Sequence, residues 1–391
     1  MSEAVFGMTP HPGLVAAAND GGNRIVKAEV FAAPIPFVQP FRQAKGLITQ
    51  SETVFVRLED AEGRVGWGEG YNVVIIYGRD HKAIYSAVAN NLLAVVKGRT
   101  PIEVSGLVNA MDSTLPDNYD AKCAVEMALY DLLGKQLGVS LSELLGGRNS
   151  DEVPVVGALP MKSPEVEAAA ARSYVSKGFK HLKLKVGEAH NWQIDVERIL
   201  SVREAVGDDI SMVADANANY DRRVALQVLS ATEEAQLDHF EQPLQRNDID
   251  GMAWLAANTS TPIAADESLH QLRDAMQIHK ANAASAYILK LIKQGGIYRC
   301  RQMAEFASAV GVTVHMSGGT ETSLAAAALL HLRATMPSVR GGVEYLFVLK
   351  EDVTTRSLAI GPQTAVPTGP GLGVEVDRNK LDRYIRQQQS A

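Results

Sequence analysis

From residue 153 onward, short apolar runs alternate with longer stretches in which apolar residues recur at helical spacing. The runs predict strands at 153–158, 181–186, 211–214, 238–241, 262–265, 286–289 and 312–315, with a weaker one at 342–346. Helical spacing covers segments such as 165–177, 195–206, 222–234 and 296–310. Strand–helix units of roughly 25 to 30 residues are what a (β/α) barrel requires. An open doubly wound sheet is the alternative, but no G-x-G-x-x-G sequence follows a strand to support its dinucleotide-binding form.

Residues 25–150 show a different pattern, with strands first and helices afterwards. Strands are predicted at 25–31, 53–58 and 65–69, and the last two flank a turn at 60–64, as in an antiparallel meander. Helices are predicted at 81–96 and 121–135, the second ending near Gly134 and Gly138. Residues 36–51 form a long polar connection, which we expect to be a loop that covers a site. This part is predicted to be an α+β domain.

The two ends of the chain complete the predicted organisation. Residues 1–24 are rich in glycine, alanine, proline and asparagine, and we expect a flexible extension without an assigned function. Residues 367–391 begin with Pro-Thr-Gly-Pro-Gly-Leu-Gly and continue as a polar helix, which we expect to pack back on the first domain. The barrel is then assigned to 151–366.

Composition narrows the classes of function. The 391 residues are 46% hydrophobic and 21% charged, as in ordinary globular proteins. The net charge of −7 provides no basic field to attract nucleic acid or anionic lipid. Two cysteines make no disulfide framework, and no apolar run is long enough to span a membrane. The first residues do not have the pattern of a secretion signal. We therefore expect a cytoplasmic protein with neither nucleic acid nor membrane as a partner.

The strand at 181–186 carries two lysines, in the sequence His-Leu-Lys-Leu-Lys-Val. The period of two places Lys183 and Lys185 on the same face of the strand. Neighbouring ammonium groups repel each other, so we expect one of them to lose its proton more readily than an isolated lysine. Without further context, the pair would simply be two lysines on a solvated strand face.

Acidic residues follow the next strands. Asp215, Glu241 and Asp266 lie at the ends of three successive predicted strands, and Lys290 lies at the end of the following one. Strand ends meet at the mouth of a barrel, so these side chains should converge there. Converging carboxylates repel unless a cation neutralises them, and hard oxygen ligands suit Mg²⁺. Any one of these acids alone would be read as a surface residue or a helix cap.

Lysines on both sides of a metal-binding carboxylate cluster suggest a proton-transfer reaction. A carboxylate substrate held there would present its α-carbon between Lys185 and Lys290. Removal of the α-proton creates an enediolate, whose charge a divalent cation stabilises. A lysine whose pKa is lowered by its neighbours and by the metal can serve as the base near neutral pH.

Together these motifs resemble the enolase superfamily, in its mandelate racemase/muconate lactonizing subgroup. The resemblance covers the chain from Ile25 to the C-terminal helix. Its motifs are Lys183-x-Lys185, Asp215-x-Asn217, Glu241-Gln242-Pro243, Asp266-Glu267-Ser268, and Lys290 ahead of Gly295-Gly296, with Trp67-Gly68-Glu69 in the first domain.

The resemblance implies a modified (β/α)₇β TIM barrel under an α+β capping domain formed by residues 25–150. By resemblance, Asp215, Glu241 and Asp266 bind Mg²⁺, with Mn²⁺ as a possible substitute. Lys185 is then the base on one face, tuned by Lys183, and Lys290 acts on the opposite face. Residues expected to support the site or contact the substrate are Asn217, Glu267, Tyr77 and, in the turn after the seventh strand, Ser317, Gly318, Thr320 and Glu321. The loops at 36–51 and 71–77 are expected to close over the substrate, and a homo-oligomer is expected.

A lysine on each face suits racemisation or epimerisation of an α-substituted carboxylate, such as an amino acid derivative. A muconate-type cycloisomerase and an o-succinylbenzoate synthase-type syn-dehydratase remain alternatives. The sequence Gly157-Ala158-Leu159-Pro160-Met161 departs from the Ser-Gly-Asp expected in muconate cycloisomerases, which counts against that substrate. A non-catalytic barrel would be expected to lack a lysine or a ligand. A sugar-acid dehydratase would need a histidine base near the seventh strand and an aspartate on the sixth, where Lys290 stands instead. His315 is interpreted as a structural residue in preference to polar lining of the site.

Overall fold

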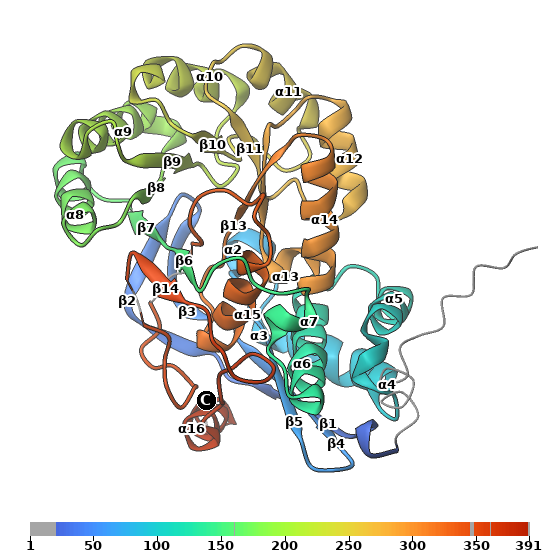
Figure 1. Cartoon of the computed structure of the whole chain (residues 1–391). Coiled ribbons are helices and arrows are strands. Elements are labelled where there is room, and N and C mark those ends of the chain that lie inside the picture. The colour runs from blue at the N-terminus through green and yellow to red at the C-terminus, as the bar shows by residue number, and fades with distance from the viewer. Residues whose placement is uncertain (1–20, 160, 345–347, 360, 390–391) are drawn as a thin grey trace, which may run out of the picture.

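We describe the fold from a computed structural model, which covers residues 21–159, 161–344, 348–359 and 361–389. Residues 1–20 of the predicted extension lie outside the described part, and Gly21–Asn23 form a short 3₁₀ helix. The chain forms a barrel of parallel strands and a separate N-terminal unit with its own antiparallel sheet (Figure 1). This arrangement confirms the predicted capped barrel.

The barrel is built on a seven-stranded parallel sheet in which neighbours in sequence are neighbours in space. Its strands are β7 (Val156–Leu159), β8 (His181–Lys185), β9 (Ser211–Asp215), β10 (His239–Glu241), β11 (Ile263–Ala265), β12 (Ala286–Leu289) and β13 (Thr313–Met316). The weak eighth strand is present only as two isolated parallel bridges, Val155 with Val343 and Ser317 with Glu344. Residues 345–347 of that prediction lie outside the described part. The bridges connect residues next to both edges of the sheet, and thereby close the barrel.

Helices cover the outside of this sheet in Figure 1, as a barrel requires. They are α8 (Pro164–Ser176), α9 (Trp192–Val206), α10 (Arg222–Ala231), α11 (Ile249–Ala257), α12 (Leu272–Lys280), α14 (Ile297–Ala309) and α15 (Ser323–Ala334). The short helix α13 (Leu291–Gln294) follows β12 and is buried against α6 of the N-terminal unit. Short 3₁₀ helices, Ala189–Asn191 and Glu233–Ala235, and the strand pair β6 (Glu152–Pro154) and β14 (Gln363–Ala365) complete this part. No helix among the described residues is both long and apolar enough to cross a membrane.

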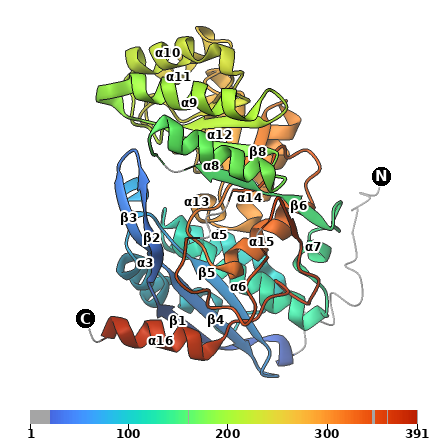
Figure 2. The same ribbon diagram turned by 90° about the vertical axis from the view of Figure 1, so that its left-hand side faces the viewer.

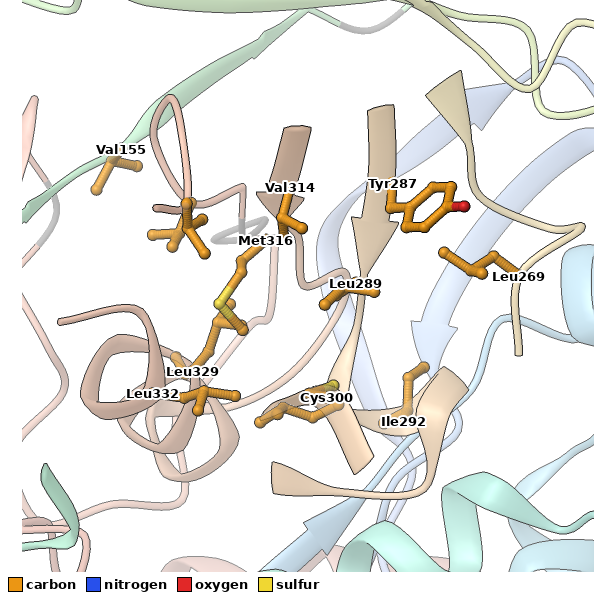
Figure 3. Packing of buried hydrophobic residues seen from close by; sticks show 14 of the residues in the cluster. Val155, Leu269, Tyr287, Leu289, Ile292, Cys300, Val314, Met316, Leu329 and Leu332 are labelled. Atoms are coloured by element: carbon orange, nitrogen blue, oxygen red, sulfur yellow. The ribbon is translucent and has the colours of Figure 1, made fainter. Parts of the chain in front are cut away.

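Figure 3 shows part of the apolar core that holds helices against the sheet. Met316 of β13 lies toward Leu329 and Leu332 of α15, and all three side chains are buried. Burying a side chain of this size contributes about 1.5–3 kcal/mol. The packing fixes the strands, and therefore the positions of the residues at their ends.

The N-terminal unit has the antiparallel order β1-β4-β5, formed by Ile25–Ala32, Val54–Asp60 and Val65–Gly70. Its helices are α2 (Val74–Tyr77), α3 (His81–Ala87), a π-helical turn (Val88–Leu92), α4 (Leu93–Val96), a 3₁₀ turn (Pro101–Glu103), α5 (Val104–Thr114), α6 (Tyr119–Leu137) and α7 (Leu141–Leu144). A Cβ added to Gly66, Gly68 or Gly70 would come within 2.4 Å of a backbone oxygen of α6. These alternating glycines therefore let β5 pack directly on the buried helix.

One expectation for this unit is wrong. Residues 36–51 are not a loop but most of a β-hairpin, β2 (Ile35–Gln43) with β3 (Gly46–Ser51). Phe37, Phe41 and Ile48 are buried on one face, at the period of a strand, and polar residues between them conceal the pattern. Phe37 also bridges Leu349, which ties the hairpin to the chain after the barrel.

The C-terminal segment contacts the N-terminal unit. Gly371 accepts a hydrogen bond from the backbone N–H of Leu141 at 2.7 Å, and Leu372 donates to Asp131 of α6 at 2.8 Å. The last helix, α16 (Arg378–Gln389), lies beside the β1–β4 sheet in Figure 2. Its Arg378 guanidinium stacks 4.2 Å from the ring centroid of Phe31.

Candidate active site

The barrel sheet places the predicted chemical groups on neighbouring strands. Lys185 ends β8, Asp215 ends β9 and Glu241 ends β10, and the register pairs Lys185 with Asp215 and Asp215 with Glu241. Asp266 and Lys290 are the residues immediately after β11 and β12. The strand order therefore sets the carboxyl groups between a lysine on β8 and a lysine after β12.

Lys183 and Lys185 occupy one side of this carboxyl group cluster. Lys183 Nζ donates to both carboxylate oxygens of Glu241 at 2.8 Å and lies 3.1 Å from Asp215 Oδ2. It also donates to Glu344 Oε2 at 2.8 Å. Lys185 Nζ donates to Asp215 Oδ2 at 2.6 Å. All five side chains are buried, so these contacts are shielded from water.

Asp266 is held from the other side by two lysines. Lys290 Nζ donates to its Oδ2 at 2.5 Å, and Lys293 Nζ donates to its Oδ1 at 2.5 Å. Lys290 Nζ also donates to the Tyr77 hydroxyl at 3.2 Å, which brings the α2 turn onto the site. The predicted position of Tyr77 over the site is thus observed.

The carboxyl groups of the site differ in the direction in which their surroundings move the pKa. Burial opposes ionisation of Asp215 and Asp266, but the nearby lysines outweigh it and hold the pKa of each well below its usual range. Burial and the Asp215 carboxylate raise the pKa of Glu241 to about 8. Burial and the Asp266 carboxylate raise the pKa of Glu267 to about 7. Glu241 and Glu267 therefore resist ionisation near neutral pH, because each lies beside a carboxylate that is already ionised.

Beside these carboxylates the pKa of Lys183 and of Lys290 is raised, whereas the lysine base tuned by its neighbours and a metal stays a prediction. Burial alone would lower the pKa of Lys183, but the carboxylates of Asp215, Glu241 and Glu344 hold it well above its ordinary value. Asp266 does the same for Lys290. The prediction considered repulsion between lysines and omitted the acids that the neighbouring strands bring to them.

The donor set has the chemistry of a magnesium site, although the described residues contain no ready-made group of three metal-ligating side chains. Asp215, Glu241 and Asp266 offer only oxygen atoms, and in this structure each bonds to a lysine. Five buried carboxyl groups, which include Glu267 and Glu344, face the buried Lys183, Lys185, Lys290 and Lys293. With all five ionised, a divalent cation and a substrate carboxylate would together bring these charges to neutrality, and buried charge requires such compensation. The residues therefore fit the ion.

Backbone conformation helps to hold the strand ends. Asn217, two residues after β9, and Gln242, directly after β10, have positive φ angles of 44° and 35°. Gln242 Oε1 accepts from the backbone N–H groups of Asp266 and Ser268 at 2.9 and 3.1 Å. Asn217 Nδ2 donates to Glu267 Oε1 at 3.1 Å. Asn217 and Glu267 thus meet beside the carboxyl group cluster.

Only some residues of the turn after β13 reach the site. Ser317 Oγ donates to Glu344 Oε2 at 2.8 Å. Gly318 and Thr320 line a cavity of about 30 Å³ above the lysines. Thr320 also shares a 2.9 Å hydrogen bond with Ser51 at the end of the hairpin. Glu321 is buried, but its Oε2 accepts from the N–H of Gly319, and the side chain does not line the cavity.

Two members of the site were missed in the sequence. Glu344 lies in the middle of the weakest predicted strand, so the strand-end rule that found the other acids passed over it. Lys293 lies three residues after Lys290 on the short helix α13, where helical spacing brings both to Asp266. The spacing of the two lysines is visible in the sequence, but a helix of 4 residues is too short to be predicted from periodicity.

Lys185 and Lys290 line the same cavity. Tyr71, Val73, Ile76 and Tyr77 cover it from the α2 region, and Gln43 covers it from the β2–β3 hairpin. A small acid in this space would have an ammonium group on either flank and the carboxyl group cluster between them.

Comparison with known proteins identifies the family in which this fold occurs. Residues 25–146 match the family described as mandelate racemase/muconate lactonizing enzyme, N-terminal domain, and residues 165–380 match the enolase C-terminal domain-like family. The chain belongs to the mandelate racemase/muconate lactonizing enzyme family of the enolase superfamily. The sequence-based recognition is confirmed, and so is the prediction of an isomerase, because the relatives are racemases, epimerases and cycloisomerases.

The relatives of this enolase-superfamily chain extend over almost its whole length. It is 31% identical to N-succinyl-L-Arg/Lys racemase of Bacillus cereus over 92% of the chain and 97% of the relative. The solved structure of that racemase superposes with a TM-score of 0.88, covering 92% of this chain and 98% of the other. Chloromuconate cycloisomerase of Cupriavidus necator is 30% identical over 90% of this chain and 96% of the relative. A dipeptide epimerase of Enterococcus faecalis, solved with Mg and a dipeptide, is 28% identical, with a TM-score of 0.85 and coverages of 90% and 99%.

Proposed function

We propose that this chain is a racemase or epimerase that moves the α-proton of a small carboxylate from one face of the molecule to the other. The observation that carries the proposal is that Lys185 and Lys290 line one cavity from strands on opposite flanks of the carboxyl group cluster. A positioned general base on each face provides for removal and return of the proton.

The lysines have distinct tasks in this reaction. Lys185 takes or gives the proton on the β8 side, where Asp215 holds its ammonium group at 2.6 Å. Lys290 does the same on the β12 side, held by Asp266 and the Tyr77 hydroxyl. Lys183 has three carboxylate partners and supplies fixed positive charge that orders the cluster. Tyr77 and the residues around it exclude water from the cavity.

Asp215, Glu241 and Asp266 would hold Mg²⁺, and Mn²⁺ is expected to substitute because it accepts the same oxygen ligands. When bound, the ion supplies positive charge that holds the substrate carboxylate and stabilises the negative charge formed on proton removal. Support comes from the buried carboxyl groups that gather at the barrel mouth of this chain and from the magnesium in the solved dipeptide epimerase.

A cycloisomerase is the second candidate, because chloromuconate cycloisomerase is among the 30%-identical relatives. Lactone formation uses one lysine as an acid and the other as a charge only. The absence of Ser-Gly-Asp at residues 157–161 disfavours muconate itself. A syn-dehydratase would use the same pair of lysines and is distinguished by its product.

The experiment is incubation of the protein with Mg²⁺ and a panel of α-substituted carboxylates in D₂O, followed by mass spectrometry and chiral chromatography. Deuterium at the α-carbon together with inversion is the expected result. A lactone or an alkene as the product would transfer the assignment to the cycloisomerase or the dehydratase. No exchange with any member would remove the racemase proposal.

We further propose a cytoplasmic enzyme that acts as a homo-oligomer on a free small-molecule acid. The acidic net charge, and the lack of a membrane-crossing helix among the described residues, are consistent with this setting.

A further inference from the structure

The chain leaves the barrel sheet directly after Lys185. The backbone N–H of Val186 still donates to the Asp215 backbone carbonyl at 2.9 Å, but Gly187 turns away with a φ of +120°. A Cβ at Gly187 would come within 2.6 Å of the Ala44 Cβ, in the turn of the β2–β3 hairpin. The loop that starts at Gly187 therefore lies between β8 and the hairpin, and contacts outside the sheet must fix its position.

A buried aspartate of α9 holds this loop. The side chain of Asp195 is fully buried, and its Oδ2 accepts from the backbone N–H groups of Gly187 and Glu188 at 3.0 and 2.7 Å. The Tyr220 hydroxyl, from the loop after β9, donates to the same oxygen at 2.6 Å. Within the described residues no backbone N–H of α9 itself donates to Asp195, so this carboxylate serves the loops and not its own helix.

Arg198 of α9 fixes the orientation of Asp195. Its Nη1 donates to Asp195 Oδ1 at 2.7 Å, and its Nε donates to the backbone carbonyl of Lys162, in the loop after β7, at 2.7 Å. Arg198 is buried as well, and hydrogen bonds between opposite charges are strong and directional. We call Asp195, Arg198 and Tyr220 the Asp195 clasp. The clasp joins the loops that follow β7, β8 and β9 at one point just beyond Lys185 in the chain.

The other lysine of the cavity depends on different contacts. The backbone N–H of Lys290 donates to Gln294 Oε1 at 2.7 Å, and Gln294 Nε2 donates to the Leu269 backbone carbonyl at 2.8 Å. Neither Gln294 nor Leu269 belongs to the Asp195 clasp. Lys185 and Lys290 line the same cavity, yet each is held by its own set of residues, so that one can be displaced without the other.

We infer that Asp195 is a positioning residue for Lys185: by fixing the loop after β8, it sets the approach of the Lys185 ammonium group to one face of the substrate. This inference rests on the proposed function, in which Lys185 and Lys290 each serve one face. A misplacement of about 1 Å can lower the rate of such a step about 10²-fold. Loss of the Asp195 carboxylate should therefore slow proton transfer for one enantiomer and spare the other.

The test follows exchange of the α-proton with solvent for each enantiomer separately. N-acetyl-L-alanine and N-acetyl-D-alanine are incubated in D₂O with the full chain and Mg²⁺. Chiral chromatography with mass spectrometry then measures deuterium in substrate of unchanged configuration, which reports the lysine on the face that carries the proton. Lys185→Ala should abolish this exchange for one enantiomer, and that enantiomer is thereby assigned to Lys185.

In Asp195→Asn, exchange of the enantiomer assigned to Lys185 should fall at least about tenfold relative to exchange of the other enantiomer. The amide keeps the shape of the side chain, but its single oxygen cannot accept from the loop and from Arg198 together. An equal loss for both enantiomers, or no loss, would overturn the inference and leave the proposed function intact. A native chain that exchanges neither enantiomer would count against both.

Two further variants act on one lysine each. Tyr220→Phe removes one hydroxyl of the clasp and keeps the ring, so it should act in the same direction as Asp195→Asn, by about threefold or more. This variant carries the test should Asp195→Asn fail to fold. Gln294→Leu should instead slow exchange of the enantiomer assigned to Lys290. A shift in the same direction for Tyr220→Phe and Gln294→Leu would contradict separate positioning of the two lysines.

Asp248→Asn is the matched control. Asp248 lies at the start of α11 and has the same kinds of partner, the backbone N–H of Gly251 at 3.1 Å and the Arg222 guanidinium at 2.9 Å. This variant should leave the ratio of the two exchange rates unchanged. A shift as large as that of Asp195→Asn would show that the ratio responds to any loop aspartate, and would overturn the inference.

Amide hydrogen exchange tests the first step without any substrate. In Asp195→Asn, the N–H groups of Gly187 and Glu188 should exchange at least about tenfold faster, because their acceptor is disturbed. The N–H of Val186, which is bonded to the neighbouring strand, should keep its rate. Unchanged protection of Gly187 and Glu188 would overturn the inference whatever the rates of turnover.

Discussion

Buried carboxyl groups occur in two regions of this molecule, and their partners differ. At the barrel mouth, Asp215 and Asp266 bond to lysine ammonium groups. Between the two units, Glu126 of α6 accepts from the backbone N–H groups of Ile297 and Tyr298, at 2.8 and 2.6 Å, at the start of α14.

Glu69 of β5 accepts hydrogen bonds at the start of α15 in a similar way. It accepts from the N–H groups of Thr322 and Ala325 and from the Thr322 hydroxyl. Burial raises the pKa of Glu69 and of Glu126 to about 8, whereas the lysines hold the pKa of Asp215 and Asp266 low. Two ammonium partners each therefore keep Asp215 and Asp266 ionised, while backbone N–H groups fix the position of Glu69 and Glu126 without securing their charge.

The largest effect on activity is expected for the two lysines at the barrel mouth. Lys185→Ala or Lys290→Ala should lower kcat/KM by about 10³-fold or more, because each removes the acid–base group of one face. Circular dichroism and thermal melting should show a retained fold. The control is Lys280→Ala, at the exposed end of α12, which should keep full activity. Native-like turnover in either site variant would disprove a two-base reaction.

Removal of the metal is the next largest effect. Treatment with a chelator should reduce turnover by more than about 10²-fold, because the charge on the reacting carboxylate is no longer compensated. Added Mg²⁺ or Mn²⁺ should restore it, whereas Na⁺ at equal ionic strength should not. Activity that is indifferent to the chelator would show that the carboxyl group cluster is paired by lysines alone.

Glu126→Ala tests how much the acids buried between the barrel and the N-terminal unit contribute to stability. It leaves two buried backbone N–H groups without acceptors and should reduce the free energy of unfolding by about 2–4 kcal/mol in urea titrations. Glu305→Ala, on the exposed side of α14, should change it by no more than about 0.5 kcal/mol. Equal effects would mean that the Glu126 contacts contribute nothing to stability.

The dependence on pH gives a smaller effect. The pKa of Glu126 is raised to about 8 in the folded chain, so its stabilising contribution is complete below the unfolded value near 4.5. That contribution is lost as pH rises through about 8. Glu126→Gln stays neutral, so the unfolding free energy of the variant minus that of the native chain should increase by on the order of 2 kcal/mol between pH 4.5 and 8. Parallel pH profiles would contradict the raised pKa.

The smallest effect on activity is expected for Tyr77→Phe. The variant removes the hydroxyl that accepts from Lys290 Nζ but keeps the ring that covers the cavity. A hydrogen bond from an ammonium group contributes about 1.5–3 kcal/mol, so kcat should fall about tenfold to a hundredfold with little change in melting temperature. A loss as large as that of Lys290→Ala would make Tyr77 an acid–base group itself.

The glycines illustrate what could be predicted and what could not. Gly295-Gly296 was recognised as part of a motif, but its reason is tertiary. Gly296 has a φ of +125°, and a Cβ there would come within 2.2 Å of Glu126 Oε2. Only glycine lets that carboxylate reach the start of α14, a contact between residues 171 positions apart.

The sequence by itself determined the alternation of strands and helices and the residues at the strand ends, because both follow from local periodicity. Lys183, Lys185, Asp215, Glu241, Asp266 and Lys290 could therefore be named without coordinates. Only the tertiary structure decided that residues 36–51 form a hairpin, that Glu344 and Lys293 join the lysine–carboxylate cluster, and which way each pKa moves. These properties depend on groups that are distant in the chain and adjacent in space, and no local pattern records that proximity.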